Sequence, residues 1–338
     1  MARTRYATDR GLIARMGVTM FLIGLVFVAF IAALIYLLGA FSNISTGGIV
    51  FLAVAAALAV SLGSYFWSDK IALSTSGARL VTPQDGPQAA ELHGIIDRLC
   101  ALADMPKPRV AIAPTDMPNA FATGRNSKVA VVCATEGLLR RLEPEEVEGV
   151  LAHEMSHVAH KDVAVMTIAS FLGIIAALVV RFAFYSELFG GDRRGNNNGN
   201  NQSALPVILI VMVVGMIVYA ISFLLIRLLS RYRELAADRS GALLTGKPSA
   251  LASALQKVTG DMARIPTKDL RAAEPLNAFY FAPAMKLARG GGRDGKGTGP
   301  SLANLFSTHP SLEKRLEQLE KIQHQLGQAT PDAPDSLR

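Results

Sequence analysis

The chain has 338 residues, of which 51% are apolar and only 18% are charged, and its formal net charge is +7. This composition is unusual for a soluble protein and indicates segments that cross a membrane. Excess Lys and Arg is typical of the cytoplasmic parts of membrane proteins, and because no basic stretch is interleaved with aromatic residues we expect no nucleic-acid partner.

Four stretches are long and apolar enough to span a lipid bilayer, which takes roughly 20 residues. They cover residues 17–41, 48–67, 163–185 and 204–226. The first is longer than the apolar run of a cleaved signal peptide, about 7–15 residues, so it is expected to remain as an anchor. No ionisable residue lies in the middle of any stretch, which argues against an ion or solute transporter.

The distribution of basic residues predicts on which side of the membrane each polar part of the chain lies. Four arginines precede the first stretch, whereas residues 42–47 contain neither Lys nor Arg, so the N-terminus is expected in the cytoplasm. Two crossings then return the polar segment 68–162 to the cytoplasm, and two more return the chain beyond the fourth stretch. Cys100 and Cys133 stand far apart and outside any CxxC pattern, so they are expected to be reduced and buried.

The polar segment 68–162 is expected to be compact. Its apolar spacing predicts a helix over 87–102, and short alternating runs predict strands over 109–113 and 128–133. Between these strands, residues 118–124 (PNAFATG) predict a turn or an irregular strand.

Two helix starts precede the most informative motif. Thr135 can cap a helix that carries Leu138, Leu139 and Leu142. Residues 143–146 (EPEE) place Pro in a first helical turn and acids near the positive end of the helix. The second helix is expected to continue through that motif.

The motif is HEMSH, over residues 153–157. On a helix His153 and His157 lie one turn apart on one face, so both imidazoles can bind the same ion. Glu154 is offset by about 100° and can accept a proton from a water that the ion activates. His160 shares a face with His157 as well, but only His153 and His157 bracket a glutamate; we expect His160 to make a supporting contact or to be solvated.

A catalytic zinc usually takes three protein ligands and keeps one position open. Glu234 and Asp238, in RELAADR after the fourth stretch, lie one turn apart on a predicted helix. One carboxylate could bind the ion while the other accepts the second N–H of a histidine, although the spacing also fits a solvated, charged helix. The two spans between the motifs bring both to one side of the membrane, as a shared ion requires.

The motifs HEMSHVAHKD, RELAADR, STHPSLEKRLEQL and PNAFATG resemble those of the HtpX-type membrane metallopeptidases, which are related to the CaaX prenyl proteases. The resemblance covers nearly the whole chain. It implies that His153, His157 and Glu234 bind one zinc ion per chain and that Glu154 is the general base. It further implies that Asp238 accepts a hydrogen bond from a ligating histidine, with His153 the expected donor.

The same resemblance assigns substrate contacts. Asn119 and Ala120 would lie at an edge strand that pairs with the substrate backbone. His309 would stabilise the tetrahedral oxyanion, although its place before Pro310 also fits an ordinary helix start. The implied substrates are misfolded or damaged membrane proteins, and the implied role is quality control under stress in a bacterial inner membrane.

Three rival functions remain to be separated. An intramembrane protease would bury HEMSH in an apolar span, but here the flanking sequences EPEEVEG and HKD are too polar for hydrocarbon. A prenyl-protein endopeptidase uses the same zinc chemistry, and such relatives typically have more spans than four. A non-catalytic membrane scaffold would not need intact ligands and an intact base.

We therefore expect a mainly α integral membrane protein with four transmembrane helices. Its catalytic domain is expected to be cytoplasmic, discontinuous, zincin-like and mostly helical, with a small β-sheet. The expected division is 1–67 for the N-terminal tail and two spans, 68–162 for the part with HEMSH, 163–229 for two further spans, 230–327 for the part with the third ligand, and 328–338 for a disordered tail. The polar stretches 191–203 and 290–300 are expected to be flexible.

Overall fold

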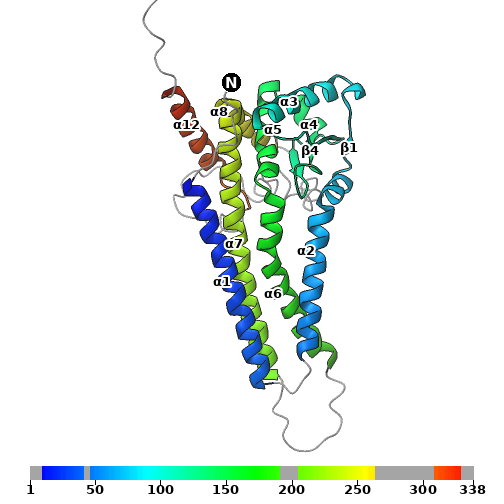
Figure 1. Ribbon diagram of the computed structural model, residues 1–338, viewed down its shortest axis with the longest axis vertical. Coiled ribbons are helices and arrows are strands. Elements are labelled where there is room, and N and C mark those ends of the chain that lie inside the picture. The colour runs from blue at the N-terminus through cyan, green and yellow to red at the C-terminus, as the bar shows by residue number, and fades with distance from the viewer. Residues whose placement is uncertain (1–9, 42–45, 191–204, 263–307, 329–338) are drawn as a thin grey trace, which may run out of the picture. The chain divides into compact units, whose positions relative to one another are not determined.

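The computed structural model describes residues 10–41, 46–190, 205–262 and 308–328 (Figure 1). These residues form two compact units. The first, here named the helix unit, comprises residues 14–65 and 164–229. The second, the mixed unit, comprises residues 66–163, the described residues from 230 onward, and residues 10–13. The predictions for 191–203, for 290–300 and for all but the first residue of 328–338 lie outside the described residues.

Four long helices supply the helix unit: α1 (Arg10–Phe41), α2 (Thr46–Ser76), α6 (Asp162–Gly190) and α7 (Leu205–Thr245) (Figure 1). Their shared contacts are apolar, and one cluster contains Phe30 of α1, Ala57 of α2 and Ile175 of α6 together with residues of α7. Large apolar side chains also face outward; Phe21 is 69% exposed and Ile168 65%. Helices that are apolar on all sides suit the hydrocarbon of a bilayer.

Three helical segments are long and apolar enough to cross a membrane: Arg10–Ala33, Asp162–Arg181 and Leu209–Thr245. They correspond to three of the four predicted spans. The predicted span over 48–67 lies within α2, which is helical throughout but is not among these segments, and the side chains of residues 46–54 lie outside the described part.

The mixed unit contains a four-stranded sheet in the order β1-β2-β4-β3. Its strands are β1 (Arg79–Leu80), β2 (Arg109–Ala113), β3 (Ala120–Thr123) and β4 (Val131–Thr135). β2 and β4 are parallel, whereas β1 pairs with β2, and β3 with β4, in antiparallel fashion. Within the described ranges, β3 is therefore an edge strand of this sheet, with one side not paired to another strand.

The predicted strand over 109–113 is confirmed. The other predicted strand, over 128–133, starts three residues later in the structure, since β4 spans Val131–Thr135. The Asn126 side chain accepts hydrogen bonds from the backbone N–H groups of Lys128 and Val129, at 3.1 and 3.2 Å. This local turn competes with the sheet, so β4 begins only at Val131. The segment 118–124, predicted as a turn or irregular strand, contains the regular strand β3.

Helices pack around the core of the mixed unit. They are α3 (Pro87–Ala103), α4 (Glu136–Arg141), α5 (Pro144–Ala159), α8 (Pro248–Met262) and α12 (Leu312–Gln328), with the short 3₁₀ helix η1 (Pro83–Asp85). One buried cluster joins Ile96 of α3, Leu151 of α5, Leu255 of α8 and Ile322 of α12. α5 contacts both β3 and α8, so this helix lies at the centre of the unit.

Both predicted helix starts are confirmed. The Thr135 hydroxyl accepts a hydrogen bond from the backbone N–H of Leu138, 3.1 Å away, and caps α4. At the start of α5, the backbone N–H of Glu143 donates to the carboxylate of Glu146 at 2.9 Å. The second cap fixes the first residue of α5 and therefore the position of HEMSH along this helix.

Candidate metal centre

HEMSH lies in the last turns of α5, where the helix is buried. His153 is fully buried, Glu154 is 5% exposed and His157 is partly buried. The helix ends at Ala159 with His160 as its C-cap, and Lys161 follows in the left-handed conformation, with φ 57°. This reversal ends α5 and lets α6 start at Asp162.

The facing side chains come from α7. Glu234 and Asp238 lie one turn apart on this helix, and both are buried. α7 can approach α5 closely because residue 241 is glycine: a Cβ there would lie 2.8 Å from the backbone N of His153. That distance is shorter than any ordinary atomic contact, so a larger residue at this position would push the helices apart.

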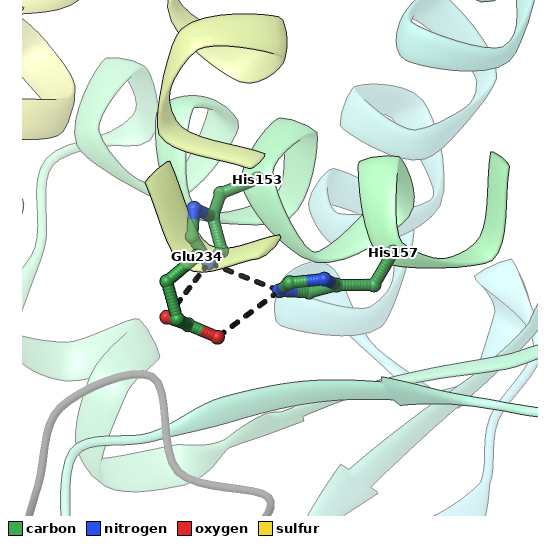
Figure 2. Close-up of side chains that lie close together, drawn as sticks. All are labelled: His153, His157 and Glu234. Atoms are coloured by element: carbon green, nitrogen blue, oxygen red, sulfur yellow. Dashed lines mark hydrogen bonds and ion pairs between the residues drawn. The ribbon is translucent and has the colours of Figure 1, made fainter. Parts of the chain in front are cut away.

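His153, His157 and Glu234 point toward one another (Figure 2). The two Nε2 atoms are 3.3 Å apart, His153 Nε2 lies 3.7 Å from Glu234 Oε2, and His157 Nε2 lies 3.5 Å from Glu234 Oε1. Ligand atoms held at about 2.0–2.2 Å from a tetrahedral zinc are about 3.3–3.6 Å from one another. The three side chains therefore have the spacing and the donor atoms of a His2Glu metal site.

The second ring nitrogen of each histidine meets a carboxylate. His153 Nδ1 lies 2.9 Å from Asp238 Oδ1, and His157 Nδ1 lies 2.5 Å from Asp162 Oδ2. Burial lowers the pKa of His153, but Asp238 and Glu234 outweigh this effect and raise its pKa to about 9. Such carboxylates orient the rings so that both Nε2 atoms face the same point.

Glu154 lies on α5 next to His153 but is not part of the group of His153, His157 and Glu234, and its carboxylate contacts the sheet. Its carboxylate Oε2 accepts a hydrogen bond from the backbone N–H of Ala122 in β3, at 3.1 Å. Burial raises the pKa of this carboxyl, although the nearby His153 and His157 oppose the shift. A carboxyl with a raised pKa is suited to accept and return a proton near neutral pH.

The remaining predicted site residues lie close by or at the expected strand. His309 Nδ1 lies 3.1 Å from Glu234 Oε2, and the residue is 5% exposed. Ala120 is the first residue of β3, and Asn119 precedes it. Among the described residues, the ligand atoms of His153, His157 and Glu234 lie close enough together to hold a metal ion, and His160 is not part of this group.

Sequence reasoning missed three residues at this centre: Asp162, Arg233 and Arg315. Arg233 Nη2 lies 2.6 Å from Asp162 Oδ2, and Arg315 of α12 binds both oxygens of Asp238. The motif HKD already contained Asp162, and the late motif HPSLEKRLEQL contained Arg315. Their contacts could not be read from spacing, because they depend on the turn at Lys161 and on the docking of a distant helix.

Comparison with known proteins gives consistent relatives. The family model described as Peptidase family M48 matches residues 87–323. Protease HtpX homolog 1 of Streptomyces coelicolor is 58% identical over 328 residues, covering 97% of this chain and 98% of that protein. Protease HtpX homolog of Moorella thermoacetica is 45% identical over 327 residues (96% and 98% covered), and Protease HtpX homolog 2 of Methanosarcina mazei is 46% identical over 324 residues (96% and 99%).

The comparison with solved structures matches the crystal structure of S. mikatae Ste24p over 91% of this chain and 67% of that chain, with 16% identity and a TM-score of 0.47. This likeness is too low to bear on the fold.

The relatives and the apolar helices define the class of this protein as a membrane metalloprotease. Its long apolar helices make it an integral membrane protein, and its reaction depends on a metal ion. The chain belongs to peptidase family M48.

Proposed function

We propose that the enzyme is a zinc endopeptidase whose single ion is held by His153, His157 and Glu234. The observation that carries this proposal is the spacing of the two imidazole Nε2 atoms and the Glu234 carboxylate oxygens, 3.3–3.7 Å, where α5 and α7 meet. Two imidazoles and one carboxylate form a donor set that suits zinc. When bound, zinc supplies Lewis acidity and lowers the pKa of a water molecule to about 7.

In this proposal Glu154 accepts the proton of the attacking water and returns it to the leaving amine. Its supports are the carboxylate's position one residue after His153 and its raised pKa. The hydrogen bond from Ala122 N–H holds one carboxylate oxygen and leaves the other to accept the proton. His309, next to Glu234, would donate a hydrogen bond to the oxyanion that forms on the substrate carbonyl.

The substrate backbone would pair with the unpaired side of β3, where Asn119 and Ala120 were expected to act. Asn119 uses its own backbone in the sheet, because its C=O accepts from Thr135 N–H and its N–H donates to the Thr135 hydroxyl. The N–H of Ala122 points the other way, toward Glu154. Backbone groups alternate along an antiparallel strand, so Ala120 presents its backbone to the open edge.

We further propose that the mixed unit is the catalytic domain and lies on the cytoplasmic side of a bacterial inner membrane, with α2 as a fourth span. His153 and His157 precede residues 164–229 of the helix unit, and Glu234 follows them in the part of α7 that belongs to the mixed unit, so two crossings by α6 and α7 would return the ligands to one side. The proposed substrates are misfolded or damaged membrane proteins.

A first test compares wild type with Glu154→Gln, both full length and purified in detergent. Casein cleavage and zinc content are measured on each, with Glu145→Gln as a matched control, because Glu145 lies on the same helix and its side chain is 66% exposed. The expected result is one zinc per chain in all three proteins and loss of cleavage in Glu154→Gln alone. Equal cleavage by Glu154→Gln would contradict the assignment of the base.

The same experiment, with a farnesylated peptide as a second substrate, separates the rival functions. A protein that binds zinc but leaves casein intact, and that cleaves a farnesylated peptide, would be a prenyl-protein endopeptidase. A protein that binds zinc and cleaves neither substrate would be a scaffold, and the proposed reaction would be wrong.

A further inference from the structure

Each histidine of the proposed metal centre contacts a buried carboxylate, and each of these carboxylates contacts a buried arginine. We propose that Asp162, Arg233 and Arg315 are positioning residues of this centre, and that its affinity for zinc depends on them. The two arrangements are Arg233–Asp162–His157 and Arg315–Asp238–His153. This inference rests on the proposed metal centre.

The arrangement at His157 uses one carboxylate oxygen. Asp162 Oδ2 lies 2.5 Å from His157 Nδ1 and 2.6 Å from Arg233 Nη2. The Asp162 side chain is 4% exposed and that of Arg233 10%. Because Asp162 is the first residue of α6, the positive end of that helix also favours its ionised form. An ionised Asp162 holds the Nδ1 proton of His157 and leaves Nε2 as the metal-binding atom.

The arrangement at His153 has a stronger arginine contact. Arg315 Nε donates to Asp238 Oδ2 at 2.7 Å and its Nη2 donates to Oδ1 at 2.6 Å. This two-point contact matches the planar guanidinium to the planar carboxylate. Its third nitrogen, Nη1, lies 3.8 Å from Glu234 Oε2, so the same arginine also faces the third ligand. Arg315 thus couples α12 to both functional carboxylates of α7.

Charge balance gives a second, independent reason for the two arginines. Among the described residues the centre buries four carboxylates: Glu154, Asp162, Glu234 and Asp238. Two arginines and one divalent ion neutralise four negative charges when the histidines are neutral. If one of the two arginines were removed, one buried negative charge would have no compensating positive charge. An uncompensated charge lowers stability in a low-dielectric interior.

The difference between the two arginine contacts makes a specific prediction. Lysine can reproduce one ion pair but not a planar two-point contact. Arg233→Lys should therefore keep most of the zinc affinity, whereas Arg315→Lys should lose it. Asp162→Asn should also lose affinity, because an amide keeps the shape of the side chain but removes its charge.

The test uses the full-length protein in detergent, in a Glu154→Gln background that prevents self-cleavage. The zinc dissociation constant is measured by competition with a chelator, the absorption spectrum is recorded with Co²⁺ in place of zinc, and the thermal unfolding midpoint reports folding. Arg98→Lys is the matched control: Arg98 pairs with Glu148 of α5 at 2.6 Å, away from the metal-binding group.

We expect Asp162→Asn and Arg315→Lys to weaken zinc binding about 10- to 100-fold and to change the Co²⁺ spectrum. Arg98→Lys should change neither. Unchanged zinc affinity and an unchanged spectrum in Asp162→Asn and Arg315→Lys would overturn the proposal, even if the unfolding midpoint fell. If Arg315→Lys does not fold, the comparison of Asp162→Asn with Arg233→Lys decides.

The Glu154→Gln parent separates this inference from the proposed function. A parent that binds no zinc would refute the metal centre and the positioning role together. A parent that binds zinc, with variants that bind it equally well, would refute the positioning role alone.

Discussion

Gly241 sets the distance between the two helices that carry the proposed ligands. In Gly241→Ala the new Cβ would lie 2.8 Å from His153 N and 3.1 Å from its Cα, whereas ordinary contacts begin at 3.4 Å. The helices would have to separate by about 0.6 Å to relieve this contact. Metal–ligand distances tolerate about 0.2 Å, so the shift exceeds the tolerance of the site.

We therefore expect Gly241→Ala to lose about 10- to 100-fold in zinc affinity, and to lower the free energy of unfolding by about 1–3 kcal/mol through overpacking. Chelator competition measures the first effect, and thermal unfolding without metal measures the second. Gly149→Ala is a graded control, since its Cβ would meet Leu251 at 3.3 Å, far milder crowding. Gly94→Ala, with nothing within 4 Å, should stabilise α3 by about 0.5–1 kcal/mol.

A Gly241→Ala variant that bound zinc and cleaved casein as well as wild type would contradict this role of Gly241. In that case a separation of the two helices would not control the position of Glu234.

Three further predictions concern other residues. Burial raises the pKa of Cys100 to about 11 and that of Cys133 to about 12. Neither thiol should therefore react with iodoacetamide at pH 8 in the folded protein, while both should react in denaturant. Rapid labelling of the folded protein, measured by mass spectrometry, would contradict this. Burial tends to raise the pKa of Glu146, but hydrogen bonding to Lys257 prevails and lowers it. The ionised carboxylate therefore stabilises the fold above the ordinary pKa, and Glu146→Gln should lower stability by about 1–2 kcal/mol at pH 7. This deficit should shrink as pH falls through the folded-state pKa, and a deficit that grew in acid unfolding scans would show the opposite sign. His309→Ala should lower kcat about 100-fold and retain zinc, whereas loss of zinc would make His309 a support of Glu234 instead.

The parts of the fold that could be predicted from sequence are those fixed by local interactions. The cap at Thr135 and the start of α5 at EPEE were both predicted correctly, and in the structure each start is held by a hydrogen bond between residues three positions apart. The HEMSH helix follows from the second cap, because its register is then fixed. The start of β4 was placed wrongly, since the competing turn at Asn126 depends on one side chain whose bonding the strand pattern does not reveal.

The parts of the centre that could not be predicted depend on contacts across the chain. Asp162 follows His157 by five residues, and only the left-handed Lys161 brings its carboxylate back to the ring. Arg315 looks like any charged residue of an amphipathic helix until α12 is seen to bury it beside Asp238. A spacing rule describes one helix at a time, so it cannot identify partners from separate helices.

The distribution of the centre along the sequence has a consequence for synthesis of the protein. Its side chains come from positions 153, 157 and 234, and Arg315 follows from α12. At about 5–20 residues per second, about 10–30 seconds pass on the ribosome between His153 and Arg315. Throughout that interval the growing chain contains HEMSH but lacks the carboxylate or the arginine that completes the cluster. With the proposed metal centre, we expect the nascent protease to be inactive until α12 has been made and has docked.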